Sequence, residues 1–251
     1  DHAMKITPLL IAAGVLAAAP AFAQANTEPA RDPAKTEVWT PVPATVATPP
    51  GKAPSDAIVL FDGKDASAWE SEQGGRVPWT VADGAMTIVP GSKGIRTRQR
   101  FCDIQLHVEW RTPVETKGFD GQNRGNSGIF LQELYELQVL DSYNNPTYAN
   151  GQAGAIYKQA MPLVNASRAP GQWQAYDILW KAPRFSQGGG LTSPARITVL
   201  HNGVLVQDDT VLAGRTEYIG APSYAPHACA PLYLQEHDSK VSYRNIWVRE
   251  L

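Results

Sequence analysis

Cysteine is scarce in this sequence, and neither sign of charge dominates it. The 251 residues include only two cysteines, with 22 lysines and arginines against 24 aspartates and glutamates, for a formal net charge of −2. Two cysteines alone argue against a structural zinc site, which usually takes four protein ligands. Because acidic and basic residues are interspersed, the sequence lacks the basic patch of a nucleic-acid-binding protein. We therefore predict no nucleic-acid partner.

Sustained helical periodicity and long apolar runs are also missing. No segment repeats apolar residues with the 3.6-residue period of an amphipathic helix, so the sequence is not that of a helical bundle. The apolar stretch from Ile6 to Ala19 has about fourteen residues, whereas a membrane-spanning helix needs about twenty. This stretch is therefore too short to be read as a transmembrane helix.

The first 23 residues have the features of a secretory signal peptide. Lys5 precedes the apolar stretch, and Ala21-Phe22-Ala23 offers a small-x-small cleavage site. Asp1-His2-Ala3 ahead of Met4 resembles an expression scar, and no cysteine follows the cleavage site to carry a lipid. We expect a soluble, exported protein that is periplasmic after signal removal and has no stable membrane insertion. The alternative is that this segment forms a buried N-terminal helix.

A change in composition divides the rest of the chain. Residues 24–55 are rich in Pro, Ala and Thr and have almost no apolar periodicity, which is typical of an extended linker or strap. Residues 56–251 have a length that suits one all-β domain. We therefore predict a signal peptide over 1–23, a linker or strap over 24–55, and a single folded domain over 56–251.

The predicted domain has the pattern of an antiparallel β-sandwich. Short runs rich in Val, Ile, Trp, Tyr and Leu are separated by Gly, Pro, Asn and Asp, which is typical of many short strands. Asn202-Gly203 and Asp83-Gly84 each predict a tight hairpin. A third hairpin is predicted at the C-terminus, where the runs 232–237 and 242–250 flank a turn. We expect two packed antiparallel sheets with strands near 79–81, 85–89, 103–111, 127–132, 135–140, 175–181, 196–201, 204–208, 232–237 and 242–250.

The two cysteines, Cys102 and Cys229, both lie where a predicted strand begins. An even number of cysteines in an exported protein favours a disulfide, and adjacent strands would bring these two within range. The sequence leaves two alternatives open, a Cys102–Cys229 disulfide or two buried free thiols.

Three predicted strands carry polar side chains with directional hydrogen-bonding groups on one face. Side chains alternate across a strand, so such faces are formed by Gln105, His107, Glu109 and Arg111, by Glu136 and Gln138, and by Gln235 and His237. A solvated outer face is the alternative for each strand, but solvated faces are usually rich in Lys, Glu and Thr. The recurrence of Gln and His, which donate and accept hydrogen bonds in defined directions, predicts a binding sheet.

Seven sequence blocks follow the order found in a known family. They are FDGKDASAWE (61–70), EWR (109–111), GNSGIFLQ (125–132), YELQVLDS (135–142), GAIY (154–157), NGVLVQD (202–208) and LQEH…YRNIWV (234–248). The body of the chain, from Ile58 to Leu251, therefore resembles the 3-keto-disaccharide hydrolase domain family. The resemblance implies a concanavalin-like, laminin-G-like jelly roll with its ligand site on the concave sheet, and a small carbohydrate as substrate.

The resemblance also implies a reaction, the cleavage of glycosides already oxidised to a ketone at carbon 3. Such a ketone acidifies the proton on carbon 2, so a modest base can remove it and the glycosidic oxygen on carbon 1 can leave by elimination. Addition of water then completes a net hydrolysis. The protein must supply a base, a donor to the enolate oxygen and an acid for the leaving oxygen. We predict no cofactor for this step.

Candidate site residues follow from the resemblance together with the polar faces. We predict Glu136 as the proton-transferring carboxylate, His237 as its partner and Glu109 as the second candidate carboxylate. Candidate substrate-binding residues are Arg124, Asn126, Gln138, Asp141, Tyr157, Trp173 and Gln235, although Trp173 could equally lie in the core. Glu136, Asp141 and His237 could gather a divalent ion, but their spacing matches no recognised motif, so we predict no metal site.

Two other functions are consistent with the same fold. A conventional retaining glycoside hydrolase needs two carboxylates about 5 Å apart, whereas Glu133 and Glu136, three positions apart on a strand, would point to opposite faces. A non-catalytic carbohydrate-binding module needs aromatic and amide side chains but no acid–base couple. The sequence does not distinguish aglycone, linkage or oligomeric state.

Overall fold

The computed structural model describes residues 31–251. The predicted signal peptide and the first residues of the predicted linker lie outside this range. Residues 31–44 belong to a unit separate from the body, Thr45–Leu251, and contain one short 3₁₀ helix, η1 (Pro33–Thr36). Across residues 31–251, no helix has both the length and the apolar character needed to cross a membrane.

The body is built from antiparallel sheets, as predicted. The larger sheet has eight strands in the order β13 (Val204–Val211), β12 (Arg196–His201), β9 (Gln174–Lys181), β6 (Ile104–Arg111), β15 (Ser242–Glu250), β4 (Ala85–Thr87) and β3 (Thr80–Ala82), with β1 (Ile58–Phe61) also paired to β15. The smaller sheet has five strands in the order β2 (Trp69–Ser71), β5 (Ile95–Thr97), β14 (Tyr233–Leu234), β7 (Ser127–Leu131) and β8 (Tyr135–Val139). A separate pair is formed by β10 (Arg184–Phe185) and β11 (Leu191–Ser193), and short 3₁₀ helices lie at η2 (Gly121–Asn123) and η3 (Ala149–Gly151). The all-β, jelly-roll-like sandwich predicted from the sequence is therefore confirmed.

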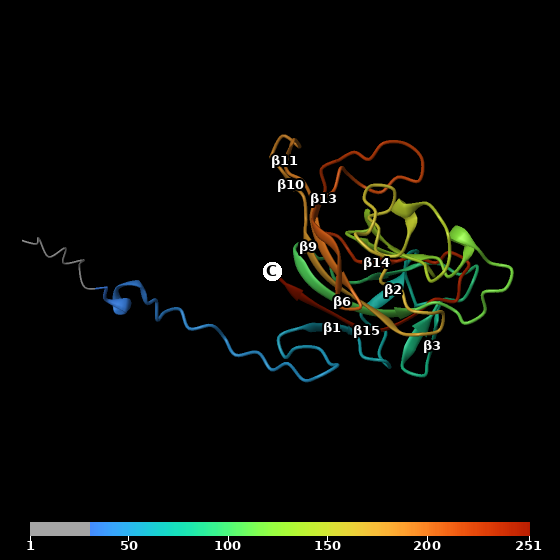
Figure 1. The fold of residues 1–251 in the computed structure, drawn as a ribbon, viewed down its shortest axis with the longest axis horizontal. Helices are drawn as coiled ribbons and strands as arrows, with labels where there is room; N and C mark the ends of the chain where they lie inside the picture. Colours follow the sequence, from blue (N-terminus) through green and yellow to red (C-terminus); the bar gives the residue numbers. More distant parts are fainter. Residues whose placement is uncertain (1–30) are drawn as a thin grey trace, which may run out of the picture. The chain divides into compact units, whose positions relative to one another are not determined.

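The hydrophobic core lies between the two sheets. Strand β6 alternates buried and half-buried residues along its whole length, as an apolar-in, polar-out strand should. Its inward side chains join those of β8 in one core cluster, which includes Leu106, Trp110, Leu137 and Val139. Figure 1 shows β9, β6 and β15 as neighbouring long, curved strands, with β14 and β2 to the right of β9 and β6 in this view. Packing against this core fixes which face of β8 points away from it.

Both of the two-residue turns expected from the sequence are present. Asn202 and Gly203 have φ values of 54° and 80° and join β12 to β13, while Asp83 and Gly84 have φ values of 52° and 75° and join β3 to β4. Positive φ at both central residues is what a tight hairpin matching the twist of its strands requires.

The predicted C-terminal hairpin is wrong. Strand β14 pairs with β5 and β7 in the five-stranded sheet, whereas β15 pairs with β6, β4 and β1 in the eight-stranded sheet. The chain between them crosses from one sheet to the other, with Asp238 at a φ of 55°. Alternation identified the two strands, but it carries no information about the sheet that each strand joins.

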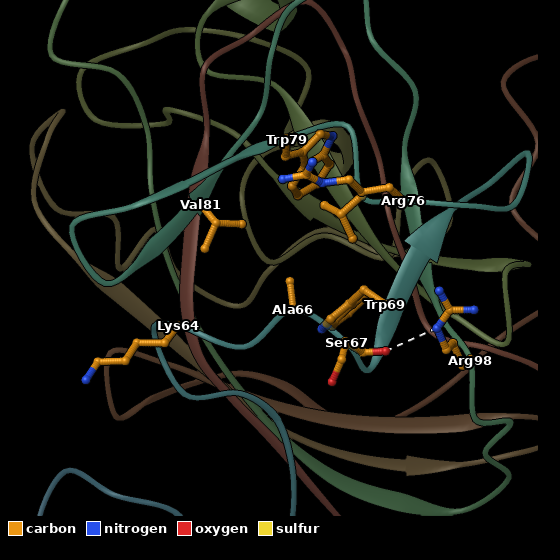
Figure 2. Close-up of a pocket in the computed structure, with 9 residues that line it drawn as sticks. Lys64, Ala66, Ser67, Trp69, Arg76, Trp79, Val81 and Arg98 are labelled. Atoms are coloured by element: carbon orange, nitrogen blue, oxygen red, sulfur yellow. Dashed lines mark hydrogen bonds between the residues drawn. The ribbon is translucent and has the colours of Figure 1, made fainter.

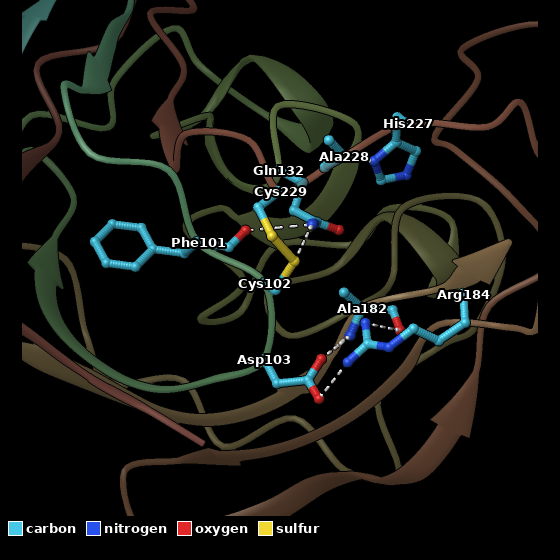
Figure 3. Close-up of a disulfide and its surroundings, with 9 residues drawn as sticks. All are labelled: Phe101, Cys102, Asp103, Gln132, Ala182, Arg184, His227, Ala228 and Cys229. Carbon is cyan, nitrogen blue, oxygen red and sulfur yellow. Dashed lines mark hydrogen bonds and ion pairs between the residues drawn. A yellow bond between two sulfur atoms is a disulfide. The ribbon is translucent and has the colours of Figure 1, made fainter. Parts of the chain in front are cut away.

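A disulfide joins Cys102 and Cys229, with their Cα atoms 4.7 Å apart. Figure 3 shows it beside two sets of contacts: the Gln132 amide donates to the Phe101 carbonyl at 3.2 Å, and Asp103 accepts from Arg184 at 2.8 Å. Phe101 and Ala230 form an isolated antiparallel bridge next to the disulfide. Of the two alternatives left open by the sequence, the structure has the disulfide.

Candidate functional site

A cavity of about 500 Å³ lies over the face of the five-stranded sheet that points away from the core. Its floor is formed by β7 and β8, and its walls by the segment after β14 and by loops. The lining residues are Gln122, Asn123, Asn126, Phe130, Glu136, Gln138, Tyr148, Tyr157, Thr216, Tyr218, Gln235 and His237. Amides and phenols therefore surround one carboxylate and one imidazole.

Glu136 on β8 is the buried carboxylate of this cavity. Its side chain and backbone together are only 6% exposed, and this burial raises the pKa of the carboxyl to about 8 because the charged form loses its hydration. The carboxyl lies directly over Gly128 of β7: a Cβ at that position would be 2.6 Å from Glu136 Oε1. The absence of a side chain at 128 thus creates the space for the carboxyl group.

A chain of amides continues from Glu136 along the floor of the cavity. The Gln138 Nε2 donates to Gln122 Oε1 at 3.1 Å and to Asn126 Oδ1 at 3.3 Å. Gln122 in turn donates to the Gly151 carbonyl at 2.9 Å, and Asn126 donates to the Gln122 carbonyl at 2.8 Å. These bonds attach the loop around η2 to the sheet.

Tyrosines form one wall. The hydroxyls of Tyr148 and Tyr157 are 2.6 Å apart, and burial followed by this hydrogen bond raises the pKa of Tyr157. The Lys158 ammonium lies 4.1 Å from the centroid of the Tyr218 ring and donates to the Tyr218 carbonyl at 2.6 Å. A cation over an aromatic face is favourable, so Lys158 holds the Tyr218 segment beside the cavity.

The structure brings six of the predicted site residues to this one cavity. They are Glu136 and His237 among the candidate catalytic residues, and Asn126, Gln138, Tyr157 and Gln235 among the candidate binding residues. Glu136 is buried, whereas His237 is exposed. The proton-transfer pair proposed from sequence therefore shares a site.

Glu109 lies elsewhere, contrary to expectation. It projects from β6 in the eight-stranded sheet, where it accepts hydrogen bonds from Arg244 at 2.6 Å and Asn245 at 2.8 Å. The ion pair with His107, whose Nε2 lies 3.7 Å from Glu109 Oε1, is the main reason that the pKa of Glu109 falls to about 2. The hydrogen bonds from Asn245 and Arg244 add to this effect, and burial opposes it. A carboxylate held in this way is a weak base, and it does not line the cavity with Glu136.

Trp173, Arg124 and Asp141 are also outside the cavity. The Trp173 ring contacts two guanidinium groups, with its centroid 4.7 Å from that of Arg111 and 4.1 Å from that of Arg244. Arg124 pairs with the buried Asp141, with Nε and Oδ2 2.9 Å apart. These side chains are occupied by structural contacts, and their predicted role in substrate binding is not supported by their positions.

Six lining residues were not identified from the sequence: Gln122, Asn123, Phe130, Tyr148, Thr216 and Tyr218. Phe130 lies on β7 within the block GNSGIFLQ (125–132), and strand alternation places it on the same face as Gly128. The other five lie outside the named strands or at η2, so no periodic pattern marks them. Glu133, considered as a second carboxylate, lies in the β7–β8 turn with a φ of 60° and not in a strand.

A second cavity, of about 580 Å³, is lined by residues between 64 and 98. Figure 2 shows that Trp69, Trp79 and the cationic side chains Lys64, Arg76 and Arg98 surround it, with Arg98 donating to the Ser67 carbonyl at 3.1 Å. Its lining includes neither a carboxylate nor an imidazole. It therefore lacks the acid–base couple of the Glu136 cavity, which we take as the candidate active site.

Comparisons with known proteins agree with this fold. A solved structure from Parabacteroides distasonis ATCC 8503, described as a "putative glycosyl hydrolase", is 50% identical, with a TM-score of 0.85 over 88% of this chain and 97% of that chain. A second solved structure from the same organism has the same description and is 21% identical, with a TM-score of 0.55 over 78% of this chain and 94% of that chain. At this identity it supports the fold alone. No curated protein matches the chain. The family model of the 3-keto-alpha-glucoside-1,2-lyase-like domain matches residues 56–249, so the chain belongs to that family.

Proposed function

We propose that this protein is a glycosidase-like enzyme that cleaves 3-keto-glycosides by elimination followed by addition of water. The observation that carries the proposal is Glu136, a buried carboxyl with a pKa of about 8 in an amide-lined cavity. General-base catalysis works best when the base has a pKa near the working pH. Family membership supports the glycosidase-like class, and the 3-keto substrate is our extension of it.

In the proposed reaction, the ionised Glu136 takes the proton from carbon 2, and the electron pair of that bond forms the enolate of the carbon 3 ketone. The enolate then forms the double bond between carbons 1 and 2 as the glycosidic oxygen leaves carbon 1 and takes up a proton. Water adds across this double bond, with hydroxyl to carbon 1 and hydrogen to carbon 2. The sum is hydrolysis with no change in oxidation state.

The remaining groups of the cavity have complementary roles in this proposal. His237, exposed on the same cavity, can donate a proton to the departing oxygen. The amides of Asn126 and Gln235 can donate hydrogen bonds to the sugar hydroxyls and to the enolate oxygen. The tyrosine wall at 148, 157 and 218 offers ring faces and hydroxyls to the sugar and its aglycone.

The proposal is tested by comparing a 3-keto-glucoside with its unoxidised parent as substrate. We expect cleavage of the keto compound only, with exchange of the carbon 2 proton for deuterium in heavy water. Glu136→Gln keeps the shape of the side chain but removes the base, and should lower kcat by at least about 100-fold, the lower end of general-base contributions. Equal cleavage of both compounds would reject elimination, because the unoxidised sugar has no acidic carbon 2 proton.

A binding module of the same fold would give a different result. It would bind the keto-glycoside without turnover, and Glu136→Gln would change only the affinity. Replacement of His237 by Gln distinguishes its role further: loss of turnover for poor leaving groups but not for activated aryl leaving groups would identify it as the acid.

We further propose that the protein acts after export, on the basis of the signal-like residues 1–23. Fractionation of the source cells, with mass measurement of the mature N-terminus, tests this. Cleavage after Ala23 and recovery from the periplasmic fraction are expected, whereas an uncleaved cytoplasmic chain would contradict the proposal.

A further inference from the structure

The Gln138 side chain stands between two groups of hydrogen-bond acceptors in the cavity floor. It is 1% exposed, so its amide must find its partners within the protein. On one side lie Gln122 Oε1 at 3.1 Å and Asn126 Oδ1 at 3.3 Å from Nε2. On the other side the amide oxygen faces Glu136 Oε1 at 3.0 Å and the Ser127 carbonyl at 3.3 Å. One amide therefore connects the catalytic carboxyl with the loop around η2.

Hydrogen bonds to backbone carbonyls fix which way the amides of Gln122 and Asn126 point. Gln122 Nε2 donates to the Gly151 carbonyl at 2.9 Å and to Thr147 Oγ1 at 3.0 Å, so its Oε1 must face Gln138. Asn126 Nδ2 donates to the Gln122 carbonyl at 2.8 Å, so its Oδ1 also faces Gln138. A carbonyl oxygen can only accept. The two hydrogens of the Gln138 amide therefore have two acceptors on this side, Gln122 Oε1 and Asn126 Oδ1.

Turning the Gln138 amide by half a rotation would exchange these contacts. Its NH₂ would then donate to Glu136 Oε1 and the Ser127 carbonyl, but its oxygen would lie 3.1 Å from Gln122 Oε1. Relieving that contact requires Gln122 to turn as well, which would point its oxygen at the Gly151 carbonyl. Each such buried acceptor–acceptor contact leaves polar groups unpaired, at a cost of about 1–3 kcal/mol per group.

We propose that Gln138 is a positioning residue that holds Glu136 in its neutral form, with the Glu136 hydroxyl donating to the Gln138 carbonyl. The Gln138 oxygen faces two acceptors, and a proton on Glu136 converts the nearer contact, with Glu136 Oε1 at 3.0 Å, into a hydrogen bond. With that proton present, every link from Glu136 through Gln138 to the Gly151 carbonyl has a donor and an acceptor. Burial of Glu136 favours the same neutral form.

Three side chains that interact electrostatically with Glu136 carry no positive charge. Tyr157, Tyr233 and Tyr243 interact electrostatically with Glu136, and burial raises the pKa of all three, so they stay neutral. His237, Tyr148 and Tyr218 line the same cavity, and the Lys158 ammonium is held against the Tyr218 ring.

The catalytic consequence rests on the proposed function. When Glu136 takes the carbon 2 proton, it becomes a neutral acid. Its hydroxyl can then donate a hydrogen bond to the Gln138 carbonyl, which is already oriented towards it. The fixed amide therefore strengthens the base by stabilising the product of proton abstraction. It also requires that the resting enzyme first lose its proton, so turnover rises as the pH approaches 8.

The test is an infrared titration of Glu136 in the whole protein, read at the carbonyl stretch of the neutral acid and assigned by its loss in Glu136→Gln. In Gln138→Met, which keeps the length of the side chain but removes the carbonyl dipole, the pKa of Glu136 should fall by about one unit, a tenfold larger ionisation constant. The acidic limb of kcat/KM for the keto-glycoside should move with it, and kcat at its plateau should drop. Gln235→Met, a second amide of the cavity, is the control and should leave the pKa of Glu136 in place.

A rise of the pKa in Gln138→Met, or no change, would overturn the proposal, because a rise means that the NH₂ faces a carboxylate. Should Gln138→Met fail to fold, neutron diffraction of the wild-type protein at pH 6 decides the matter. Deuterium on Glu136 and ND₂ directed at Gln122 and Asn126 are expected, and ND₂ directed at Glu136 would reject the inference. Because neither readout needs turnover, an inactive protein would reject the proposed function without rejecting the hydrogen-bond arrangement.

Discussion

Gly128 determines, at the scale of single residues, where the Glu136 carboxyl can lie. In the register of β7 and β8, Gly128 pairs with Gln138 and Phe130 pairs with Glu136, so Gly128 and Glu136 are diagonal neighbours two positions apart on the same face. No left-handed backbone is needed at 128. A Cβ there would come 2.6 Å from Glu136 Oε1 and 2.9 Å from the Phe130 ring, closer than real side chains approach. Both neighbours line the cavity, so an added methyl group would push the carboxyl out of its place rather than strain the strand.

We therefore expect Gly128→Ala to reduce kcat/KM by about 100-fold or more, since displacing a catalytic group by about 1 Å costs that much. Thermal unfolding should show that the fold is kept. Gly188→Ala is the matched control, because the nearest atom to its added Cβ is Ser186 Oγ at 4.0 Å, and it should have wild-type activity. Wild-type activity in Gly128→Ala would show that the position of Glu136 is not critical.

At the scale of elements, His107 connects the central strands of the eight-stranded sheet. It projects from β6, its Nδ1 is 2.6 Å from Asp177 of β9, and its ring stacks on Trp247 of β15 with centroids 5.3 Å apart. Burial alone would lower the pKa of His107, but the hydrogen bond with Asp177 and the ion pair with Glu109, 3.7 Å away, outweigh it and raise the pKa to about 9. The imidazolium therefore links three strands on the face away from the core.

This linkage predicts a loss of stability at alkaline pH. The folded-state pKa of His107 is above the ordinary value of 6.5, so its contribution is complete below pH 6.5 and is lost as the pH rises through about 9. We expect the Tm to fall between pH 7 and 10 by roughly 4–8 °C, equivalent to about 2 kcal/mol for a domain of this size. Scanning calorimetry checks it: His107→Gln should flatten this part of the pH profile, and a profile unchanged by the substitution would contradict the assignment.

Strand alternation predicted where the strands lie in the sequence better than it predicted which strands pair with each other. The faces of β6 and β8 were correctly separated into apolar and polar sides, because a side chain's face depends only on its own strand. Glu109 and Glu136 nevertheless lie in different sheets, and the supposed C-terminal hairpin is a crossing between them. Sheet membership depends on long-range pairing, such as that of β14 with β5 and β7, which leaves no mark in local periodicity.

The loop residues of the cavity were the hardest to anticipate. Gln122 and Tyr218 reach the site through tertiary contacts, namely the Gln122 bond to Gly151 and the Lys158 contact with Tyr218. By contrast, Gln235 and His237 were found because they continue the alternation of a strand. Their place beside Glu136 comes from a backbone hydrogen bond, in which the Gln235 N–H donates to the Gly128 carbonyl at 2.9 Å.

At the scale of the whole molecule, the disulfide joins segments 127 residues apart in sequence. Cys102 lies just before β6 of the eight-stranded sheet, and Cys229 lies just before β14 of the five-stranded sheet, so the bond fastens the two sheets to each other at one end of these strands. In the chain-entropy account, closing so long a loop stabilises the fold by restricting the unfolded chain. Neither cysteine lines the Glu136 cavity, so the bond affects stability and not the chemistry.

The double substitution Cys102→Ala with Cys229→Ala should therefore lower the free energy of unfolding by roughly 2–5 kcal/mol. Urea titration followed by tryptophan fluorescence measures it, and reduced wild-type protein should unfold at nearly the same midpoint as the variant. Below that midpoint, kcat and KM should match those of the oxidised wild type, since the cavity is formed by other residues. An unchanged midpoint would show that the unfolded chain gains little freedom from the missing bond, and a large loss of activity in the folded variant would show that the link between the sheets positions the floor of the cavity.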